Sequence, residues 1–242
     1  MSATFFVSDL HLCETRPQTT RLFLDFLANH ASKAEALYIL GDLFEYWAGD
    51  DDLDDLHHSE IVSALRVLSE YGTTIRIMHG NRDLLMGQAF ARACGAELLP
   101  DPLIIQLHGR KTMLTHGDTM CTDDVEYQQF RRQVHTPSWQ QTFLALPLAQ
   151  RKAQIAAFRA RSEQEKLHKD RRIMDVNADA VAEMVRNHDY PEVLIHGHTH
   201  RPDRHRLVVD GRVCERIVLA DWDASGSYLL YDDTGCRAIT IT

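Results

Sequence analysis

The sequence lacks the features of several specialised classes of protein. No apolar run reaches the ~18 residues that a membrane-spanning helix needs. The first eight residues have no basic segment and only a short apolar run, so we expect no signal peptide. The five cysteines are odd in number and show no Cys-x-x-Cys spacing, which argues against a disulfide framework and a thiolate zinc site. We therefore expect a protein of a reducing compartment, the cytoplasm.

Acidic residues outnumber basic residues in the sequence. There are 26 Lys and Arg against 35 Asp and Glu, a formal net charge of −9, and this balance argues against a nucleic-acid partner. A hydrophobic content of 44% and a charged content of 25% are ordinary for a globular chain and exclude a disordered or collagen-like one. No feature indicates an obligate protein partner. Histidine, in contrast, is abundant, with 14 residues.

Strand-like and helical patterns alternate through the first half of the chain, which is typical of βαβ units. The last third returns to strand patterns. Between them, residues 122–190 consist of helix-forming residues with almost no strand signal. We predict an α/β core over residues 1–121 and 191–242, interrupted by a helical cap over residues 122–190. An insertion of this length is typical of a functional lid.

Polar residues recur directly after five predicted strands, the first three about one βαβ unit apart. The segments are Asp9-Leu10-His11, Gly41-Asp42, Gly80-Asn81-Arg82-Asp83, His116-Gly117-Asp118 and His196-Gly197-His198-Thr199-His200. Because the carboxyl ends of strands in an open α/β sheet form the ligand-binding edge, we expect these segments to converge. A single His is more often structural, and Gly-Asp is a common turn. Five such strand ends together indicate one polar site.

The donors of this site favour divalent metal ions. Imidazole and oxygen donors without thiolate suit Mn²⁺, Fe²⁺ or Zn²⁺. Seven donors exceed the four of a tetrahedral site, so we expect two ions that share a bridging carboxylate. Two ions ~3.5–4 Å apart serve the hydrolysis of a phosphoester or phosphoanhydride. The candidate ligands are Asp9, His11, Asp42, Asn81, His116, His198 and His200.

The five segments, in this order, resemble the signature of the calcineurin-like metallophosphoesterases. The resemblance implies an α/β (α+β) fold, a four-layer β-sandwich flanked by helices, with a helical lid insertion. It also implies two metal sites with Asp42 as the bridging ligand. One ion is implied to be held by Asp9, His11, Asp42 and His200, and the other by Asp42, Asn81, His116 and His198.

Longer blocks resemble the branch of this family that acts in lipid A biosynthesis. These blocks are residues 8–13, 38–45, 79–83, 116–124, 143–147, 173–177 and 196–202. The resemblance implies Mn²⁺-dependent hydrolysis of the pyrophosphate of UDP-2,3-diacylglucosamine to UMP and 2,3-diacylglucosamine 1-phosphate. It further implies a peripheral protein on the cytoplasmic face of the inner membrane. The alternative is a metallophosphoesterase that acts on another nucleotide or pyrophosphate substrate.

The same resemblance implies a set of substrate contacts, with Arg82 and Asn81 as catalytic residues. The contacts are Asn81, Arg82, Asp124, Ser162, Lys166, Lys169 and His198. A planar guanidinium suits bidentate binding of phosphate, so we expect Arg82 to stabilise developing phosphoryl charge. The alternative for Arg82 is a salt bridge to Asp83. For His79 and His196, orientation of the ligands and a purely structural role are both open.

The predicted insertion has an uneven charge. Residues 151–172 carry a net charge of +5, which leaves −14 for the rest of the chain, and apolar residues such as Phe143 and Phe158 lie nearby. With the resemblance, these features favour contact with an anionic lipid, whereas the alternative is an amphipathic helix packed on the core. The acidic run of residues 50–55 departs from the EF-hand pattern, so we expect a solvated loop there.

Overall fold

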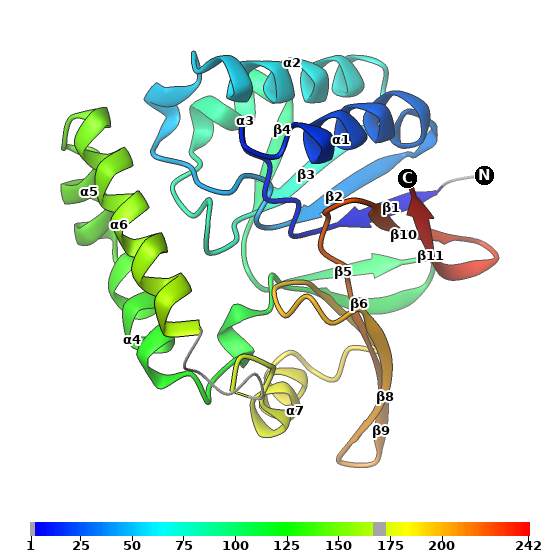
Figure 1. The fold of residues 1–242 in the computed structure, drawn as a ribbon. Coiled ribbons are helices and arrows are strands. Elements are labelled where there is room, and N and C mark those ends of the chain that lie inside the picture. The colour runs from blue at the N-terminus through cyan, green and yellow to red at the C-terminus, as the bar shows by residue number, and fades with distance from the viewer. Residues whose placement is uncertain (1–2, 167–172) are drawn as a thin grey trace.

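The computed structural model describes residues 3–166 and 173–242 and shows two stacked sheets with helices outside them (Figure 1). The first sheet has the strand order β11-β10-β1-β2-β3-β4. Strands β1 to β4 run parallel, and β10 and β11 are antiparallel neighbours. The strands are β1 (Thr4–Val7), β2 (Ala36–Leu40), β3 (Thr74–Met78), β4 (Ala96–Leu99), β10 (Gly226–Asp232) and β11 (Gly235–Ile241).

The second sheet has the order β5-β6-β7-β9-β8. Strand β7 is parallel to both β6 and β9, whereas β5 and β8 pair antiparallel at the two edges. Segments that follow β6 and β7 therefore leave this sheet on the same side. The strands are β5 (Leu103–Leu107), β6 (Arg110–Leu114), β7 (Val193–His196), β8 (Asp203–Val209) and β9 (Arg212–Val218).

Alternating side chains of β1 to β3 enter two different cores. Phe5 and Val7 pack with the helices that cover the first sheet, while Phe6 packs between the two sheets. Because both faces of these strands are buried, they read as continuous apolar runs. The covering helices are α1 (Pro17–Asn29), α2 (Leu56–Glu70) and α3 (Gln88–Cys94).

A fourth layer lies on the outer face of the second sheet. Val181 and Val185 of α7 (Ala178–Asn187) share a buried cluster with Met113 of β6 and Leu194 of β7. The layers are therefore helices, sheet, sheet and helix. The predicted four-layer sandwich is confirmed.

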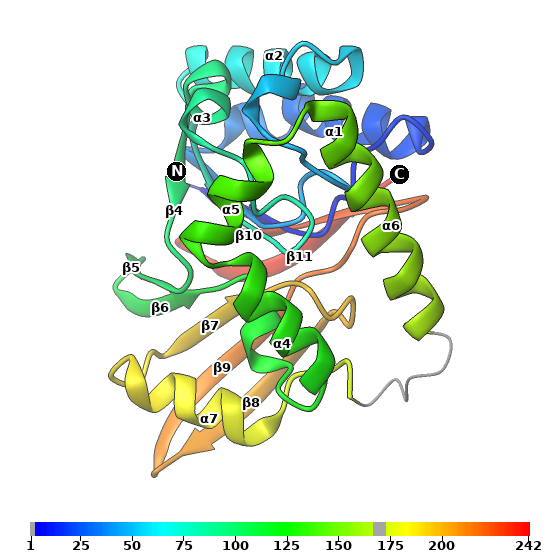
Figure 2. The same ribbon diagram turned by 90° about the vertical axis from the view of Figure 1, so that its left-hand side faces the viewer.

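Three further helices stand together on one side of the molecule (Figure 2). They are α4 (Val125–Val134), α5 (Pro137–Leu144) and α6 (Leu148–Lys166), and we call them the cap helices. Pro137 begins α5 after Thr136, whose side chain accepts a hydrogen bond from the Trp139 backbone N–H. None of the described helices is long and apolar enough to cross a membrane.

The acidic run of residues 50–55 is not the solvated loop that the sequence predicts. The Asp50 carboxylate accepts backbone N–H groups at the start of α3, including those of Ala89 and Phe90 at 2.9 and 3.0 Å. Asp52 is buried, and its Oδ1 atom lies 2.8 Å from Lys152 Nζ of α6. The run therefore joins the core to the cap helices.

Candidate metal and catalytic site

Most of the predicted ligands lie on strained backbone. A positive φ costs a non-glycine residue about 1–3 kcal/mol and persists only where the surrounding structure holds it, typically at functional sites. Five of the seven candidate ligands adopt it, with φ between 50° and 69°. They are Asp9, His11, Asp42, His198 and His200.

Two glycines let these segments approach closely. A Cβ atom on Gly80 would lie 2.1 Å from Asp42 Oδ1, and one on Gly197 would lie 2.2 Å from Asp9 Oδ2. Because such contacts are impossible, only glycine fits at either position. The segments after β1, β2, β3 and β7 can therefore meet.

One group of donors combines Asp9, His11 and His200, whose ligand atoms lie within 4.8 Å of one another. The Nε2 atoms of His11 and His200 are 3.3 Å apart, and His200 Nε2 is 3.4 Å from Asp9 Oδ1. Asp9 Oδ1 is buried and has no hydrogen-bond partner in the described part of the chain. This group has the composition and spacing of a cation site.

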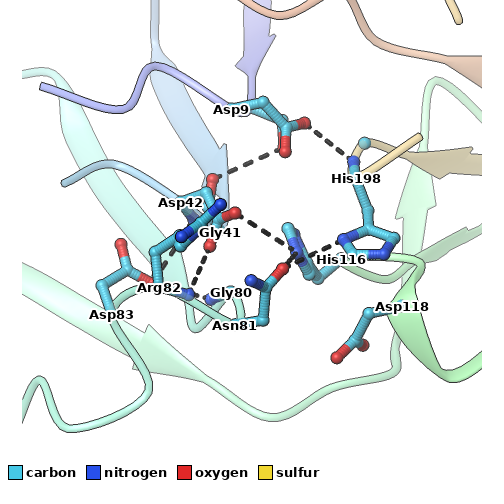
Figure 3. A network of polar contacts seen from close by, with 12 residues as sticks. Asp9, Gly41, Asp42, Gly80, Asn81, Arg82, Asp83, His116, Asp118 and His198 are labelled. Atoms are coloured by element: carbon cyan, nitrogen blue, oxygen red, sulfur yellow. Dashed lines mark hydrogen bonds and ion pairs between the residues drawn. The ribbon is translucent and has the colours of Figure 1, made fainter. Parts of the chain in front are cut away.

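A second group lies beside it (Figure 3). Asn81 Oδ1 is 3.3 Å from His116 Nε2 and 3.0 Å from His198 Nδ1. Asp42 Oδ2 is 3.9 Å from His116 Nε2 and equally 3.9 Å from His11 Nε2 of the first group. The Asp42 carboxylate therefore lies between the two groups.

Neighbouring groups orient both carboxylates. Asp9 Oδ2 accepts the His198 backbone N–H at 2.8 Å, and Asp42 Oδ1 accepts the Arg82 backbone N–H at 2.8 Å. In each case the second oxygen is left facing the donor cluster. One hydrogen bond thus fixes each carboxylate without using the oxygen that a cation needs.

Three imidazoles are held in the same way through Nδ1. His116 Nδ1 lies 2.9 Å from the Leu40 carbonyl, His11 Nδ1 lies 3.0 Å from Glu45, and His200 Nδ1 lies 3.4 Å from Asp221. With its proton on Nδ1, His116 donates to the Leu40 carbonyl, and the carboxylates beside His11 and His200 favour the same tautomer, whose Nε2 lone pair faces the cluster. This is the usual support of a metal-binding histidine.

The carboxylates of the cluster favour positive charge on the groups beside them. Burial alone lowers the pKa of His116, but the Asp42 and Asp9 carboxylates raise it to about 9. The Asp221 and Asp9 carboxylates likewise raise the His200 pKa to about 10, against the effect of burial. A divalent cation can supply the charge that these protons provide, so the donor set fits a metal ion.

Asp83 does not form the salt bridge that was the alternative for Arg82. Its carboxylate accepts backbone N–H groups of Gly80 and Leu43, both at 2.8 Å, and thereby joins the segments after β2 and β3. Burial and the nearby Asp42 charge raise its pKa to about 6. The Arg82 side chain instead faces Glu45, with 3.7 Å between Nη1 and Oε1.

Comparison with known proteins identifies the family. A model of the calcineurin-like phosphoesterases matches residues 4–202. The chain is 54% identical over 235 residues to a UDP-2,3-diacylglucosamine hydrolase of Aromatoleum aromaticum, covering 97% of this chain and 95% of the relative. It is 49% identical over 225 residues to a protein of the same name from Escherichia coli O6:H1, covering 93% of each.

The chain belongs to the calcineurin-like phosphoesterase family. A similar relative from Aeromonas hydrophila, also called UDP-2,3-diacylglucosamine hydrolase, is 48% identical over 228 residues and covers 94% of each chain. The predicted resemblance, the fold and the class of metal-dependent hydrolase are confirmed. Family membership and the donor cluster together support a divalent metal.

A cavity of about 1040 Å³ opens from the donor cluster of this phosphoesterase. His11, Asn81 and His198 line one part of it, while Phe143 and Phe158 of the cap helices line another. The cavity is therefore polar at the cluster, and beneath the cap it has aromatic side chains together with charged ones such as Arg131 and Arg159. Such a surface suits a ligand with a charged group at one end and an apolar group at the other.

The predicted substrate contacts are only partly within the described structure. Arg82, Asp124 and Ser162 line the cavity, and Asp124 also begins α4 by accepting the Tyr127 backbone N–H at 3.1 Å. Nothing is described of the Lys166 side chain, and Lys169 lies outside the described residues. The structure brings Asn81 and His198 to the donor cluster, as the sequence predicts.

His79 and His196 make backbone contacts. His79 Nε2 lies 2.7 Å from the Met86 carbonyl. His196 is fully buried, its Nδ1 lies 2.9 Å from the Gly197 carbonyl, and its Nε2 accepts from Arg216 at 3.1 Å. Burial lowers the His196 pKa to about 3, so the ring is neutral. These contacts favour the structural alternative for both.

Sequence reasoning gave no role to several side chains that surround the cluster. Asp118 is buried and accepts hydrogen bonds from Tyr127 and Arg131 of α4 at 2.7 and 2.6 Å. The Tyr127 ring stacks on His198 with 5.8 Å between centroids. Asp118 is part of the segment after β6, and its partners Tyr127 and Arg131 come only 9 and 13 residues later, but no motif in the sequence marks them as partners.

A third group of acidic and imidazole side chains is already neutralised. Asp52, Asp55 and His58 have the spacing of a cation site. Lys152 Nζ lies 2.8 Å from Asp52 Oδ1 and 3.4 Å from Asp55 Oδ2. The ammonium group takes the position of a cation, so this group is an ion-pair network.

Proposed function

We propose that this protein hydrolyses the pyrophosphate bond of UDP-2,3-diacylglucosamine, releasing UMP and 2,3-diacylglucosamine 1-phosphate. The observation that carries the proposal is the identity of 48–54% over nearly the whole chain to proteins named as hydrolases of this compound. The cavity supports it, because a diacylated nucleotide has a charged part and a large apolar part. Another nucleotide or pyrophosphate substrate is the alternative.

We propose two Mn²⁺ ions as the resident metals, with the ligand sets that the family resemblance implies. The position of Asp42 Oδ2, 3.9 Å from an imidazole nitrogen of each group, supports its role as the shared ligand. The remaining ligands would be Asp9, His11 and His200 for one ion and Asn81, His116 and His198 for the other. When bound, the ions supply Lewis acidity toward the phosphate oxygens and the attacking water.

The residues of the chain bind and orient the pyrophosphate. Arg82 lines the cavity beside Asn81, and its planar guanidinium is suited to two oxygens of one phosphate. A positive group at this position stabilises the charge that develops as the P–O bond breaks. One water adds across the P–O–P bond, so each product keeps one phosphate. We propose Asp124, Ser162, Lys166 and Lys169 as further substrate contacts.

We propose that residues 122–190 are an insertion into the core formed by residues 1–121 and 191–242. Within it, the cap helices line the apolar part of the cavity and α7 covers the second sheet. Access to a membrane-embedded lipid suggests a peripheral protein at the cytoplasmic face of the inner membrane. Exposed Leu144 and Phe158 on the cap support this location.

Incubation of the purified protein with UDP-2,3-diacylglucosamine and Mn²⁺ tests the proposal. We expect equimolar UMP and 2,3-diacylglucosamine 1-phosphate by mass spectrometry. UDP-glucosamine, which lacks the acyl chains, is the matched control and should react far more slowly. Hydrolysis of bis(p-nitrophenyl) phosphate without release of UMP from the lipid would rule out the proposed substrate and favour the alternative.

A further inference from the structure

Glu45 occupies an unusual position between the donor cluster and the cap. Its side chain is 14% exposed, and Oε2 lies 3.0 Å from His11 Nδ1. Its other oxygen, Oε1, pairs with Arg159 of α6 and lies 3.7 Å from Arg82 Nη1. One carboxylate thus contacts a candidate metal ligand, a candidate catalytic residue and a cap helix.

The geometry excludes a direct role for Glu45 as a ligand of the cluster. His11 faces Asp42 and His200 through Nε2, and it faces Glu45 through Nδ1 on the other side of the ring. A negative carboxylate beside Nδ1 favours the tautomer with its proton there, whose Nε2 lone pair can bind a cation. Glu45 contacts the candidate ligand His11, and the His11 ring separates the Glu45 carboxylate from the cluster.

Three partners hold this carboxylate in place. His11 Nδ1 contacts Oε2, and the positive guanidinium groups of Arg82 and Arg159 lie against Oε1. Arg159 is the partner supplied by the cap, and its side chain is 37% exposed. If α6 moves away from the core, Glu45 loses one of these positive partners.

We propose that Glu45 is a positioning residue that couples the seating of α6 on the core to the orientation of His11 and Arg82. The proposal rests on the proposed metal site. The cap helix then has two functions: it lines the cavity and it completes the support of the metal ligand. The centre binds its cation most tightly when α6 is in place.

Titration with Mn²⁺, followed by the electron paramagnetic resonance signal of the free ion, tests this coupling without any substrate. E45Q keeps the shape of the side chain but removes its charge, and we expect the Mn²⁺ Kd to rise about 10–100-fold. R159M should raise the Kd several-fold. The double variant should bind like E45Q alone, because Arg159 has nothing to hold once the carboxylate is gone.

K152M is the matched control. Lys152 also joins α6 to core carboxylates, Asp52 and Asp55, but has no contact with Glu45 among those described. We expect a wild-type Mn²⁺ Kd for K152M. A wild-type Kd for R159M, losses that multiply in the double variant, or equal losses for K152M and R159M would each overturn the coupling.

D42N separates failure of the coupling from failure of the proposed centre. If D42N binds Mn²⁺ normally, the proposed metal site is wrong. If D42N weakens binding and R159M does not, only the coupling is wrong. Circular dichroism verifies that each variant is folded, and should E45Q not fold, the pair R159M and K152M decides the question, since both residues are partly exposed.

Discussion

At the scale of single residues, the site depends on small polar contacts that fix each donor atom. Asp42 illustrates this, because the Arg82 backbone N–H holds one of its oxygens while the other faces both donor groups. The backbone φ of 53° at Asp42 adds strain that only the surrounding loops can maintain. A substitution here changes the centre without changing the volume of the core.

The first prediction concerns the proposed bridge. Asp42→Asn should reduce hydrolysis to the background rate and weaken Mn²⁺ binding, because an amide has only one lone-pair oxygen and no charge to share between two ions. The bound metal is counted by mass spectrometry of the intact protein, and the rate is followed by release of UMP. Full turnover of the variant at saturating Mn²⁺ would contradict a shared ligand.

The second prediction concerns Arg82. Arg82→Lys keeps the charge but loses the planar pair of donors, so we expect kcat to fall about 10²–10³-fold with a small change in KM. Steady-state kinetics with the diacylated substrate separates the two parameters. A rise in KM with an unchanged kcat would show that Arg82 only binds the ground state.

At the scale of elements, α6 is fastened to the core by charged side chains. The buried Arg151 side chain, 2% exposed, donates to the backbone carbonyls of Leu146 and Ala48 and pairs with Asp51. Farther along α6, Lys152 pairs with Asp55 and Arg159 pairs with Glu45. The basic residues at the start of the predicted +5 patch therefore hold the cap on the core, and do not form an open anionic-lipid surface.

The third prediction tests this attachment. Arg151→Met should lower the free energy of unfolding by about 1–3 kcal/mol, because buried carbonyl groups lose their donors. Amide hydrogen exchange in α6 should become faster than in the wild type. R66M, which removes the exposed pair of Arg66 and Glu70 within α2, should cost less than about 1 kcal/mol. Equal losses in the two variants would contradict the role of burial.

At the scale of the whole molecule, the donor cluster connects the two sheets. Asp9, Asp42 and Asn81 follow strands of the first sheet, whereas His116 and His198 follow strands of the second. A cation bound by both sets adds a link between the two sheets to the apolar layer and the hydrogen bonds that already join them. Metal binding should therefore stabilise the entire fold.

The fourth prediction is the effect of metal removal. Each Mn²⁺ site, at about 100 times its Kd, should add about 2.7 kcal/mol of stability over the metal-free protein. For a chain of this size we expect a rise in Tm of about 5–10 °C for each site, which EDTA should abolish. Differential scanning calorimetry measures it. A Tm that does not change would rule out a centre that links the sheets.

The fifth prediction concerns the cavity between the cap and the core. Phe158 is 40% exposed and its ring lies 5.5 Å from that of Phe130. Phe158→Glu should raise KM for the diacylated substrate about tenfold or more, because it places a charge against apolar chains. Hydrolysis of bis(p-nitrophenyl) phosphate should be unchanged. An equal effect on both substrates would place the acyl chains elsewhere.

Periodicity predicted most of the secondary structure. The predicted alternation in the first half of the chain is confirmed by β1, α1, β2, α2, β3 and α3, which follow one another in that order. Strand β4 was not predicted, because Ala96–Leu99 directly follows α3 and is too short to show alternation. The role of residues 50–55 was mispredicted, since neither the start of α3, which Asp50 contacts, nor Lys152, which lies beside Asp52, is near them in sequence.

The sequence by itself determined the fold class and the seven candidate ligands, because strand periodicity and strand-end chemistry are local patterns. Only the tertiary structure decided what surrounds those ligands. Asp83 joins two loops, Glu45 contacts His11 and Arg159, and α4 reaches Asp118. These contacts depend on how separate segments pack against one another, and that arrangement leaves no spacing pattern in the chain.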